Sequence, residues 1–349
     1  MRGCVRPLGA QSEGVTSMRA QRGAPRLEAP PPLAALQSGP MPARVGNVLV
    51  GTASWTERTL LESGAFYPPG VTAPADRLRY YARHFPVVEV DATFYALPAE
   101  RMARAWVERV PTDFVFGVKA FAALTQHPFV PARLPSDLRT AIGATLARRP
   151  RVYPRELPAE VDAEMWRRFA SALTPLHDAG LLGYVLLQFP KWFPRSRTSL
   201  AYLESCATRL PYPLAIEFRD PSWFVEGRAE RTFGFLRARG LAYVSVDEPQ
   251  GTPASVPPLA AATSDDLAVV RFHGRNRDAW NRQGVSTVEK FGYQYTHDEL
   301  REWRPRIEGL AKQSRRVLVL MNNCRNQYAV QNAKELATIL AAGPLTARR

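Results

Sequence analysis

Cysteine is scarce in this chain, whose 349 residues include only Cys4, Cys206 and Cys324. Their number is odd and no two have C-x-x-C spacing, which argues against a disulfide framework and against a structural zinc site. Such sparse cysteine fits a reduced compartment, so we expect a cytoplasmic protein.

Long apolar runs and familiar cofactor motifs are also missing. No stretch approaches the roughly 20 apolar residues of a membrane helix, and no secretory signal is recognisable, so we expect no membrane partner. The patterns G-x-G-x-x-G, Walker A, G-x-S-x-G and E-x-x-H do not occur. Their absence argues against dinucleotide, P-loop and serine-hydrolase chemistry and leaves no nucleotide-cofactor signature.

Lysine is rare as well, with five among 46 basic residues, although the formal net charge is +14. A basic chain invites a nucleic-acid partner. Residues 1–44 contribute +4 and Arg348 with Arg349 contribute +2, so +8 remains for the rest. Nucleic acid is therefore left open as a partner, and the arginine excess is also compatible with genome composition.

The two ends differ in composition from the rest of the chain. Residues 1–44 are rich in Ala, Pro, Gly and Arg without periodicity, which predicts a disordered tail. Initiation at Met41 would leave everything downstream intact, so residues 1–40 need not belong to the native product. We expect one domain over residues 45–342 and a short tail over residues 343–349.

Strand patterns alternate with helical patterns along this domain, which predicts a parallel sheet and, with eight strands, a single-domain (β/α)₈ TIM barrel. The predicted strands are Gly51–Trp55, Val87–Tyr95, Phe114–Phe121, Gly183–Pro190, Leu214–Asp220, Ala242–Glu248, Leu267–Gly274 and Val317–Asn323. Helices are expected near Asp76–His84, Ala99–Val110, Val161–Ala179, Leu200–Leu210, Glu226–Arg239, His297–Lys312 and Gln327–Ala341. The long connections His127–Glu160 and Pro249–Asp266 favour either a lid or substrate wall, or a packed insertion.

Polar residues stand near the carboxyl ends of these strands, where TIM barrels build their active sites. Because side chains alternate along a strand, one set shares the barrel interior. It comprises Glu89, Asp91, Thr93 and Tyr95; Lys119; Tyr184 and Gln188; Glu217 and Arg219; Tyr243, Ser245 and Asp247; and Arg271 and His273. The acidic and basic members nearly balance, which favours an ion-paired cavity for a small polar or anionic ligand over an acidic metal cage.

Six of these residues are the catalytic candidates: Glu89, Asp91, Lys119, Glu217, Arg219 and His273. Glu89 or Asp91 would act as general base, Lys119 and Arg219 as electrostatic stabilisers, and His273 as proton donor. A divalent metal on Glu89, Asp91, Glu217, Asp247 and His273 is an alternative, and so is a plug of mutual ion pairs with Lys119 bound to Glu89.

The substrate-binding candidates surround this set. Loops after the last two barrel strands often bind phosphate, and aromatic rings can stack a sugar or base. Asn326 is placed to cap the last helix, which would leave Arg275 and Arg325 free for an anion. The candidates are Trp55, Tyr95, His127, Gln188, Trp223, Asp247, Arg271, Arg275, Asn322 and Asn323. Cys324 lies beside them but has no histidine nearby in sequence to activate a nucleophile.

Several of these segments together resemble the domain of unknown function 72 family, the YecE-like proteins, over about Val45 to Leu340. They include Gly51-Thr-Ala-Ser-Trp55, Glu89-Val-Asp91-Ala-Thr93-Phe-Tyr95, Gln188-Phe-Pro190, Glu217-Phe-Arg219, Arg271-Phe-His273-Gly274 and Asn322-Asn323. The resemblance implies a TIM barrel and no particular activity.

We therefore expect an enzyme that uses acid/base chemistry on a small polar or phosphorylated substrate, as a hydrolase, lyase or isomerase. The alternatives are a nucleic-acid phosphodiesterase or binder, and a non-catalytic barrel that binds a ligand or partner. The sequence does not indicate an oligomeric state.

Overall fold

Eight parallel strands form a closed barrel in the computed structural model, which describes residues 43–225, 227–253, 255–282 and 284–343. The strands are β2 Val48–Ala53, β3 Val87–Val90, β4 Val115–Lys119, β5 Leu182–Gln188, β6 Leu214–Glu217, β7 Ala242–Asp247, β8 Leu267–Phe272 and β9 Arg316–Met321. Each strand pairs with the next, and β9 returns to pair with β2. The predicted TIM-barrel fold is confirmed.

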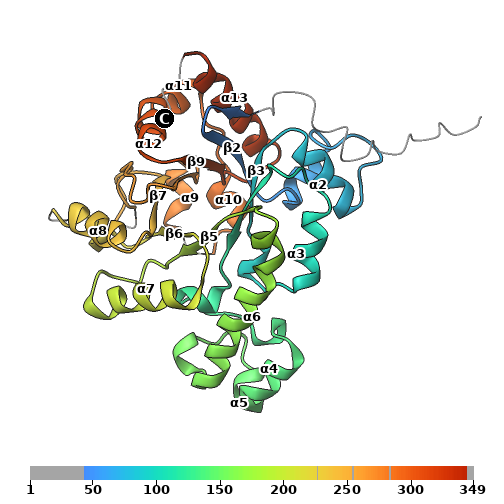
Figure 1. The fold of residues 1–349 in the computed structure, drawn as a ribbon, viewed down its shortest axis with the longest axis vertical. Coiled ribbons are helices and arrows are strands. Elements are labelled where there is room, and N and C mark those ends of the chain that lie inside the picture. Colours follow the sequence, from blue (N-terminus) through green and yellow to red (C-terminus); the bar gives the residue numbers. More distant parts are fainter. Residues whose placement is uncertain (1–42, 226, 254, 283, 344–349) are drawn as a thin grey trace, which may run out of the picture. The chain divides into compact units, whose positions relative to one another are not determined.

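Helices connect the strands and surround the barrel (Figure 1). Their apolar faces pack on the strands, whose side chains are buried on both faces. Their bounds are α1 Arg58–Ser63, α2 Pro74–Ala82, α3 Glu100–Val107, α4 Ser136–Ala141, α5 Gly143–Ala147, α6 Ala159–Asp178, α7 Arg197–Arg209, α8 Arg228–Arg237, α9 Arg277–Trp280, α10 Thr287–Phe291, α11 His297–Arg301, α12 Arg304–Gln313 and α13 Tyr328–Ala341. In the described part of the chain, no helix is long and apolar enough to cross a membrane.

The amino-terminal boundary differs slightly from the prediction. Arg44 and Val45 form β1, a short antiparallel strand on the start of β2, and Arg44 pairs with Asp113 at 3.2 Å. Arg44 therefore belongs to the folded domain rather than to the tail. Residues 1–42, with Met41, and residues 344–349 lie outside the described residues.

The connection over residues 127–160 is a packed insertion. It contains α4 and α5, and its ends are joined by an antiparallel bridge between Phe129 and Val152. Leu134, Leu138 and Ile142 are buried, while Asp137 of α4 pairs with Arg168 of α6. These two short helices were not predicted, because a run of prolines is more typical of loops.

Strands end earlier than the patterns indicated. Strand β3 stops at Val90, and Ala92–Phe94 forms a turn of 3₁₀-helix instead of extending the strand. Tyr95 is consequently 53% exposed rather than directed into the barrel. The predicted helix 297–312 is also two helices, α11 and α12, with Pro305 in the first turn of the second.

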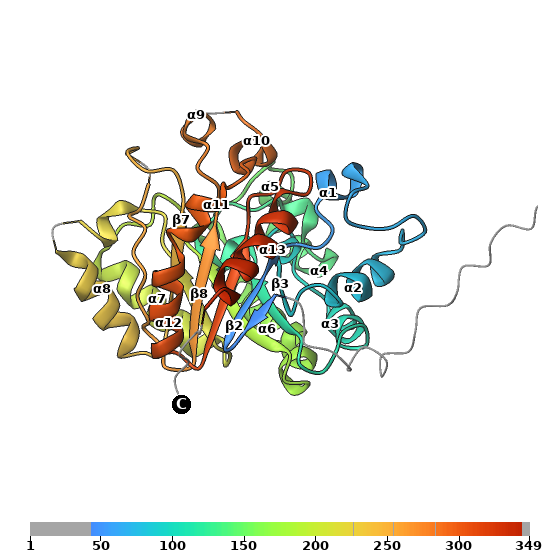
Figure 2. The ribbon, with the colours of Figure 1, turned by 90° about the horizontal axis from the view of Figure 1, so that it is seen from above.

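The segment between β8 and α11 rises above the carboxyl ends of the strands. Figure 2 shows α9 and α10 beyond the tip of the β8 arrow. Asn276 caps α9 by accepting a hydrogen bond from Ala279 N, and Ser286 with Glu289 forms a capping box on α10. These caps position two aromatic rings, Trp280 and Phe291, over the barrel mouth.

Candidate active site

Arg271 of β8 lies fully buried at the centre of the barrel mouth and joins two buried carboxylates. Its Nη2 donates to Glu89 Oε1 at 2.6 Å, and its Nη1 donates to Glu217 Oε2 at 2.6 Å. Tyr184 donates its hydroxyl to the second Glu89 oxygen at 2.6 Å. Burial raises the pKa of Glu89, against the opposing effect of Arg271. Both oxygens of Glu89 and both terminal nitrogens of Arg271 are thus engaged by protein groups, and the cluster forms the floor of the mouth.

Glu217 at the end of β6 is the most heavily engaged acid of the cluster. Besides Arg271, it accepts from Gln188 Nε2 at 2.7 Å and lies 2.6 Å from Arg219 Nε and 3.1 Å from His273 Nε2. Burial opposes its ionisation, but Arg219 and Arg271 outweigh that effect and hold the pKa of Glu217 well below its ordinary value. Glu217 therefore stays ionised and orients its neighbours.

His273 is buried between Glu217 and Asn322. Its Nδ1 lies 3.0 Å from Asn322 Nδ2, and its Nε2 also lies 3.2 Å from Arg219 Nη2. Burial lowers the pKa of His273 to about 3, and Arg219 adds to the effect. The imidazole is consequently neutral near pH 7, so it can relay or donate a hydrogen bond but does not supply an imidazolium proton.

The prediction that Asp247 faces the barrel interior is wrong. In the β7–β8 pairing Val246 lies opposite Arg271, while Asp247 lies opposite Phe272. Residues opposite one another share a face of the sheet, so Asp247 points toward the helices. Tyr243 does the same, with its ring 5.0 Å from that of Phe233 in α8. The prediction found the alternation of polar and apolar residues in β7, but the polar side chains face the helices and the apolar ones face the interior.

Asp247 belongs instead to a polar cluster outside the barrel. It accepts from the Tyr295 hydroxyl and the Trp303 Nε1, both at 2.6 Å, and from Arg275 Nη2 at 2.8 Å. Arg275 also pairs with Glu302 at 2.9 Å and with Glu299 at 3.5 Å. Arg275 is therefore engaged with three carboxylates, which argues against the anion-binding role predicted for it.

Glu248 occupies the interior position that was predicted for Asp247, and it was not among the predicted site residues. Its Oε2 accepts from Arg219 Nη1 at 2.7 Å, and its Oε1 accepts from Val256 N at 2.8 Å. Burial raises the pKa of Glu248 to about 7, although Arg219 lowers it. Of the two long connections, residues 249–266 thus contribute to the wall of the site, through the amide of Val256.

Asp91 and Lys119 form the accessible edge of the charged group. The Lys119 Nζ lies 3.7 Å from Asp91 Oδ1, which also lies 3.8 Å from Arg271 Nη2. Lys119 therefore pairs with Asp91, whereas the sequence had suggested a pair with Glu89. This Asp91 oxygen is buried, yet it has no hydrogen-bond partner among the described residues, while the side chain as a whole is 26% exposed.

His127 and Trp192 extend the mouth outward from Lys119. The Lys119 Nζ lies 4.6 Å from the Phe94 ring, which contacts His127 with ring centroids 5.1 Å apart. Burial lowers the pKa of His127 to about 4, with Lys119 and Arg219 adding to the effect. His127 is therefore neutral near pH 7, and its ring lies 5.9 Å from that of Trp192.

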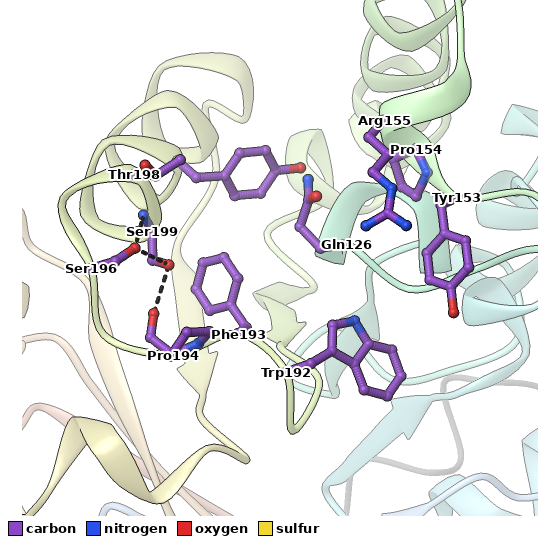
Figure 3. Close-up of a pocket in the computed structure, with 11 residues that line it drawn as sticks. Gln126, Tyr153, Pro154, Arg155, Trp192, Phe193, Pro194, Ser196, Thr198 and Ser199 are labelled. Carbon is purple, nitrogen blue, oxygen red and sulfur yellow. Dashed lines mark hydrogen bonds between the residues drawn. The ribbon is translucent and has the colours of Figure 1, made fainter.

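A groove of about 280 Å³ continues from Trp192 between the residue 127–160 insertion and the start of α7. Figure 3 shows Trp192, Gln126, Tyr153 and Arg155 along one side of it. On the other side the Ser196 hydroxyl accepts from Ser199 N, and the Ser199 hydroxyl donates to Pro194 O, as the dashed lines in Figure 3 indicate. These hydroxyls stabilise the start of α7. The groove combines aromatic rings, such as those of Trp192 and Tyr153, with polar side chains such as Gln126 and Arg155.

Other predicted binding residues lie away from the mouth. Trp55 packs edge-on against Trp106 of α3, and Trp223 stacks on Phe218 while its Nε1 donates to Phe193 O. Asn323 donates to Tyr293 O and to Asn332 Oδ1. The residues brought together at the mouth are Glu89, Asp91, Lys119, Gln188, Glu217, Arg219, Arg271, His273 and Asn322, with Tyr95 and His127 at the rim.

Three further expectations can be placed. Asn326 does not cap α13, which begins after Gln327 without a side-chain cap. The backbone N–H of Asn326 instead donates to the Thr59 hydroxyl. Burial raises the pKa of Cys324 to about 12, which disfavours a reactive thiolate. Among the described residues no group of three or more His, Cys, Asp or Glu side chains could hold a metal ion. The five acidic and histidine candidates therefore do not form one ligand cluster.

Relatives of the chain are found both in sequence and in structure. UPF0759 protein YunF of Bacillus subtilis (strain 168) is 33% identical over 297 residues, which cover 84% of this chain and 94% of the relative. UPF0759 protein YecE of Escherichia coli (strain K12) is 30% identical over 184 residues, which cover 52% of this chain and 56% of the relative.

The crystal structure of a DUF72 family protein from Thermotoga maritima MSB8 is similar with a TM-score of 0.64 and 30% identity, covering 84% of this chain and 98% of that one. Another, from Enterococcus faecalis V583, has a TM-score of 0.68 at 24% identity, covers 85% of this chain and 96% of that one, and supports the fold alone. The family model described as "Protein of unknown function DUF72" matches residues 49–348. The chain belongs to the DUF72 family.

Proposed function

We propose that this protein is an enzyme that transfers a proton to or from a small polar substrate held at the barrel mouth. Asp91 carries the proposal. One of its carboxylate oxygens is buried without a hydrogen bond among the described residues, 3.7 Å from Lys119 Nζ and 3.8 Å from Arg271 Nη2. A buried acceptor without a hydrogen bond is costly unless a ligand or an ordered water supplies the missing donor, and a substrate at the mouth would supply it here.

The other charged residues of the mouth then have distinct tasks. Asp91 is the general base, and Lys119 stabilises negative charge that develops on the substrate. Glu89 and Glu217 are positioning residues, because every oxygen of theirs is already engaged by Arg271 and its neighbours. Neutral His273 orients Glu217 and Asn322 rather than acting as the acid.

Incubation in D₂O with a panel of small phosphorylated and carboxylated carbonyl compounds tests this function. Proton NMR would follow both deuterium incorporation and product formation. The wild type should exchange or convert at least one compound, and Asp91→Asn should reduce that rate by about 100-fold or more. Asp113→Asn is the matched control, since Asp113 pairs with Arg44 at the opposite end of the barrel. Equal rates in wild type and Asp91→Asn, or no conversion of any compound, would contradict the proposal.

A further inference from the structure

Three of the five lysines in the chain, Lys119, Lys191 and Lys290, lie at the barrel mouth. Elsewhere the chain uses arginine for nearly all of its positive charge. Lysine differs from arginine in being a compact charge with three rotatable donors, and it is a common phosphate ligand. The position of these lysines is therefore informative, and Lys191 and Lys290 have no part in the chemistry proposed above.

Lys191 and Lys290 come from different loops and approach the same ring. The Lys191 Nζ, after β5, lies 5.6 Å from the centroid of the Trp280 ring, and the Lys290 Nζ, in α10, lies 5.1 Å from it. The guanidinium of Arg219 lies 5.4 Å from the same centroid. Three cations thus surround one buried indole, whose Nε1 has no hydrogen-bond partner among the described residues.

The two lysines have no anionic partner of their own. Neither forms an ion pair with a carboxylate of the described chain, whereas Arg219 is shared between Glu217 and Glu248. Both are half-buried, and burial lowers the pKa of Lys191 to about 8, with Lys290 and Arg219 contributing by repulsion. Glu248 opposes this effect at both lysines, but it is already paired with Arg219 and does not outweigh the burial. Holding unpaired cations together in this way is unfavourable, and an anion between them would remove the cost.

We propose that Lys191 and Lys290, beside Arg219 and Trp280, bind the phosphate of a small phosphomonoester substrate. The proposal rests on the proposed function, because it places the phosphate on one side of the mouth and the reacting end of the same substrate beside Asp91 and Lys119. The two lysines thus take the anion-binding role that was predicted for Arg275, which is paired with three carboxylates outside the barrel.

The helices above the mouth connect the two halves of this site. Trp280 of α9 contacts Phe291 of α10 with ring centroids 5.8 Å apart, and Phe291 lies 5.7 Å from the His273 ring. The same short segment therefore supplies Lys290 to the phosphate and covers the buried network of His273 and Glu217. A phosphate held by Lys290 would fix the position of α10, which Figure 2 shows beyond the end of β8, relative to the substrate.

Calorimetric titration of the full-length protein with inorganic phosphate, at constant ionic strength, tests the site. Lys191→Met and Lys290→Met should each weaken phosphate binding about tenfold or more, since each removes a charge-assisted hydrogen bond. Lys290→Arg should retain most of the affinity. Lys334→Met is the matched control, because Lys334 also lies over an aromatic ring, 5.8 Å from the Phe66 centroid in another part of the barrel.

The outcomes separate this site from the proposed catalytic base. Asp91→Asn should bind phosphate as well as the wild type does, so a failure of the proton-exchange experiment would leave a lysine-dependent phosphate site intact. No phosphate binding by the wild type, or undiminished binding by Lys191→Met and Lys290→Met, overturns the proposal. An oligonucleotide that binds through these lysines and is not displaced by phosphate would also overturn it, in favour of a nucleic-acid ligand.

Discussion

Two polar clusters lie near the carboxyl ends of the strands, on opposite faces of the barrel wall. The inner cluster is centred on Arg271, with Glu89, Glu217 and Asp91, and the outer cluster is centred on Asp247, with Arg275, Tyr295 and Trp303. The outer cluster gives every oxygen of its acid a protein donor. The inner cluster leaves Asp91 Oδ1 without a protein donor, and nearby Lys191 and Lys290 have no carboxylate ion pair in the described chain. Complete pairing is typical of a structural cluster, and incomplete pairing indicates a place for a ligand.

Arg271→Met should have the largest effect on stability. It leaves Glu89 and Glu217 buried without their shared cation, which should lower the free energy of unfolding by about 3–5 kcal/mol. Urea denaturation followed by circular dichroism measures this. By the same principle, a loss below about 1 kcal/mol would mean that Glu89 and Glu217 are readily protonated. The ion pairs with Arg271 would then not be required for stability.

Asp247→Ala should have the next largest effect and should sharpen the contrast with the inner cluster. It removes the acceptor of Tyr295, Trp303 and Arg275 and should cost about 3 kcal/mol of stability. Phosphate binding and catalysis measured on the folded fraction should not change. Lost phosphate affinity in a folded Asp247→Ala protein would show that the outer cluster takes part in the site.

The pH dependence of stability should distinguish His273 from a non-titrating residue. Its pKa is about 3 in the folded protein against an ordinary 6.5, so the unfolded chain binds the proton more readily. The contribution of His273 is therefore complete above pH 6.5 and is lost as the pH falls toward 3, at up to about 1.4 kcal/mol per pH unit. Wild type should lose stability relative to His273→Gln between pH 7 and pH 5. If the free energies of unfolding of wild type and His273→Gln changed in parallel with pH, the conclusion that His273 is buried and neutral would be wrong.

Asp91→Asn should have the smallest effect on stability and the clearest effect on function. Because Asp91 Oδ1 accepts no hydrogen bond in the described chain and lies 3.7 Å and 3.8 Å from its two cationic partners, the amide should lower the free energy of unfolding by about 1 kcal/mol or less. The same variant should lack proton exchange. Thermal unfolding measures the effect on stability, and the NMR assay measures the effect on proton exchange. A large loss of stability would place Asp91 among the structural residues.

Much of the fold was predictable, because strand and helix patterns alternate clearly and Glu89, Glu217, Arg271 and His273 sit where barrel strands end. Parity placed these four correctly on the interior face. It failed at Asp247, because β7 alternates apolar residues with Tyr243, Ser245 and Asp247, and these polar side chains lie on the helix-facing side of the strand instead of the interior side. It also failed at Tyr95, where a 3₁₀ turn replaces the strand.

Lys191 and Lys290 could not be found from strand patterns. Lys191 lies in a loop, and Lys290 lies on a short helix of a connection whose path over the mouth depends on tertiary contacts. The only indication in the sequence was the scarcity of lysine, because five lysines among 46 basic residues suggest that their positions are specific.

The bond between Arg271 and Glu89 also bears on how the protein folds. Its two residues are 182 positions apart in sequence, and it joins β8 to β3 across the interior. It can form only after the intervening strands have assembled, so its contribution should be absent from the folding transition state. Losing it should therefore speed unfolding while leaving the folding rate nearly unchanged, which makes Arg271 a determinant of the lifetime of the closed barrel.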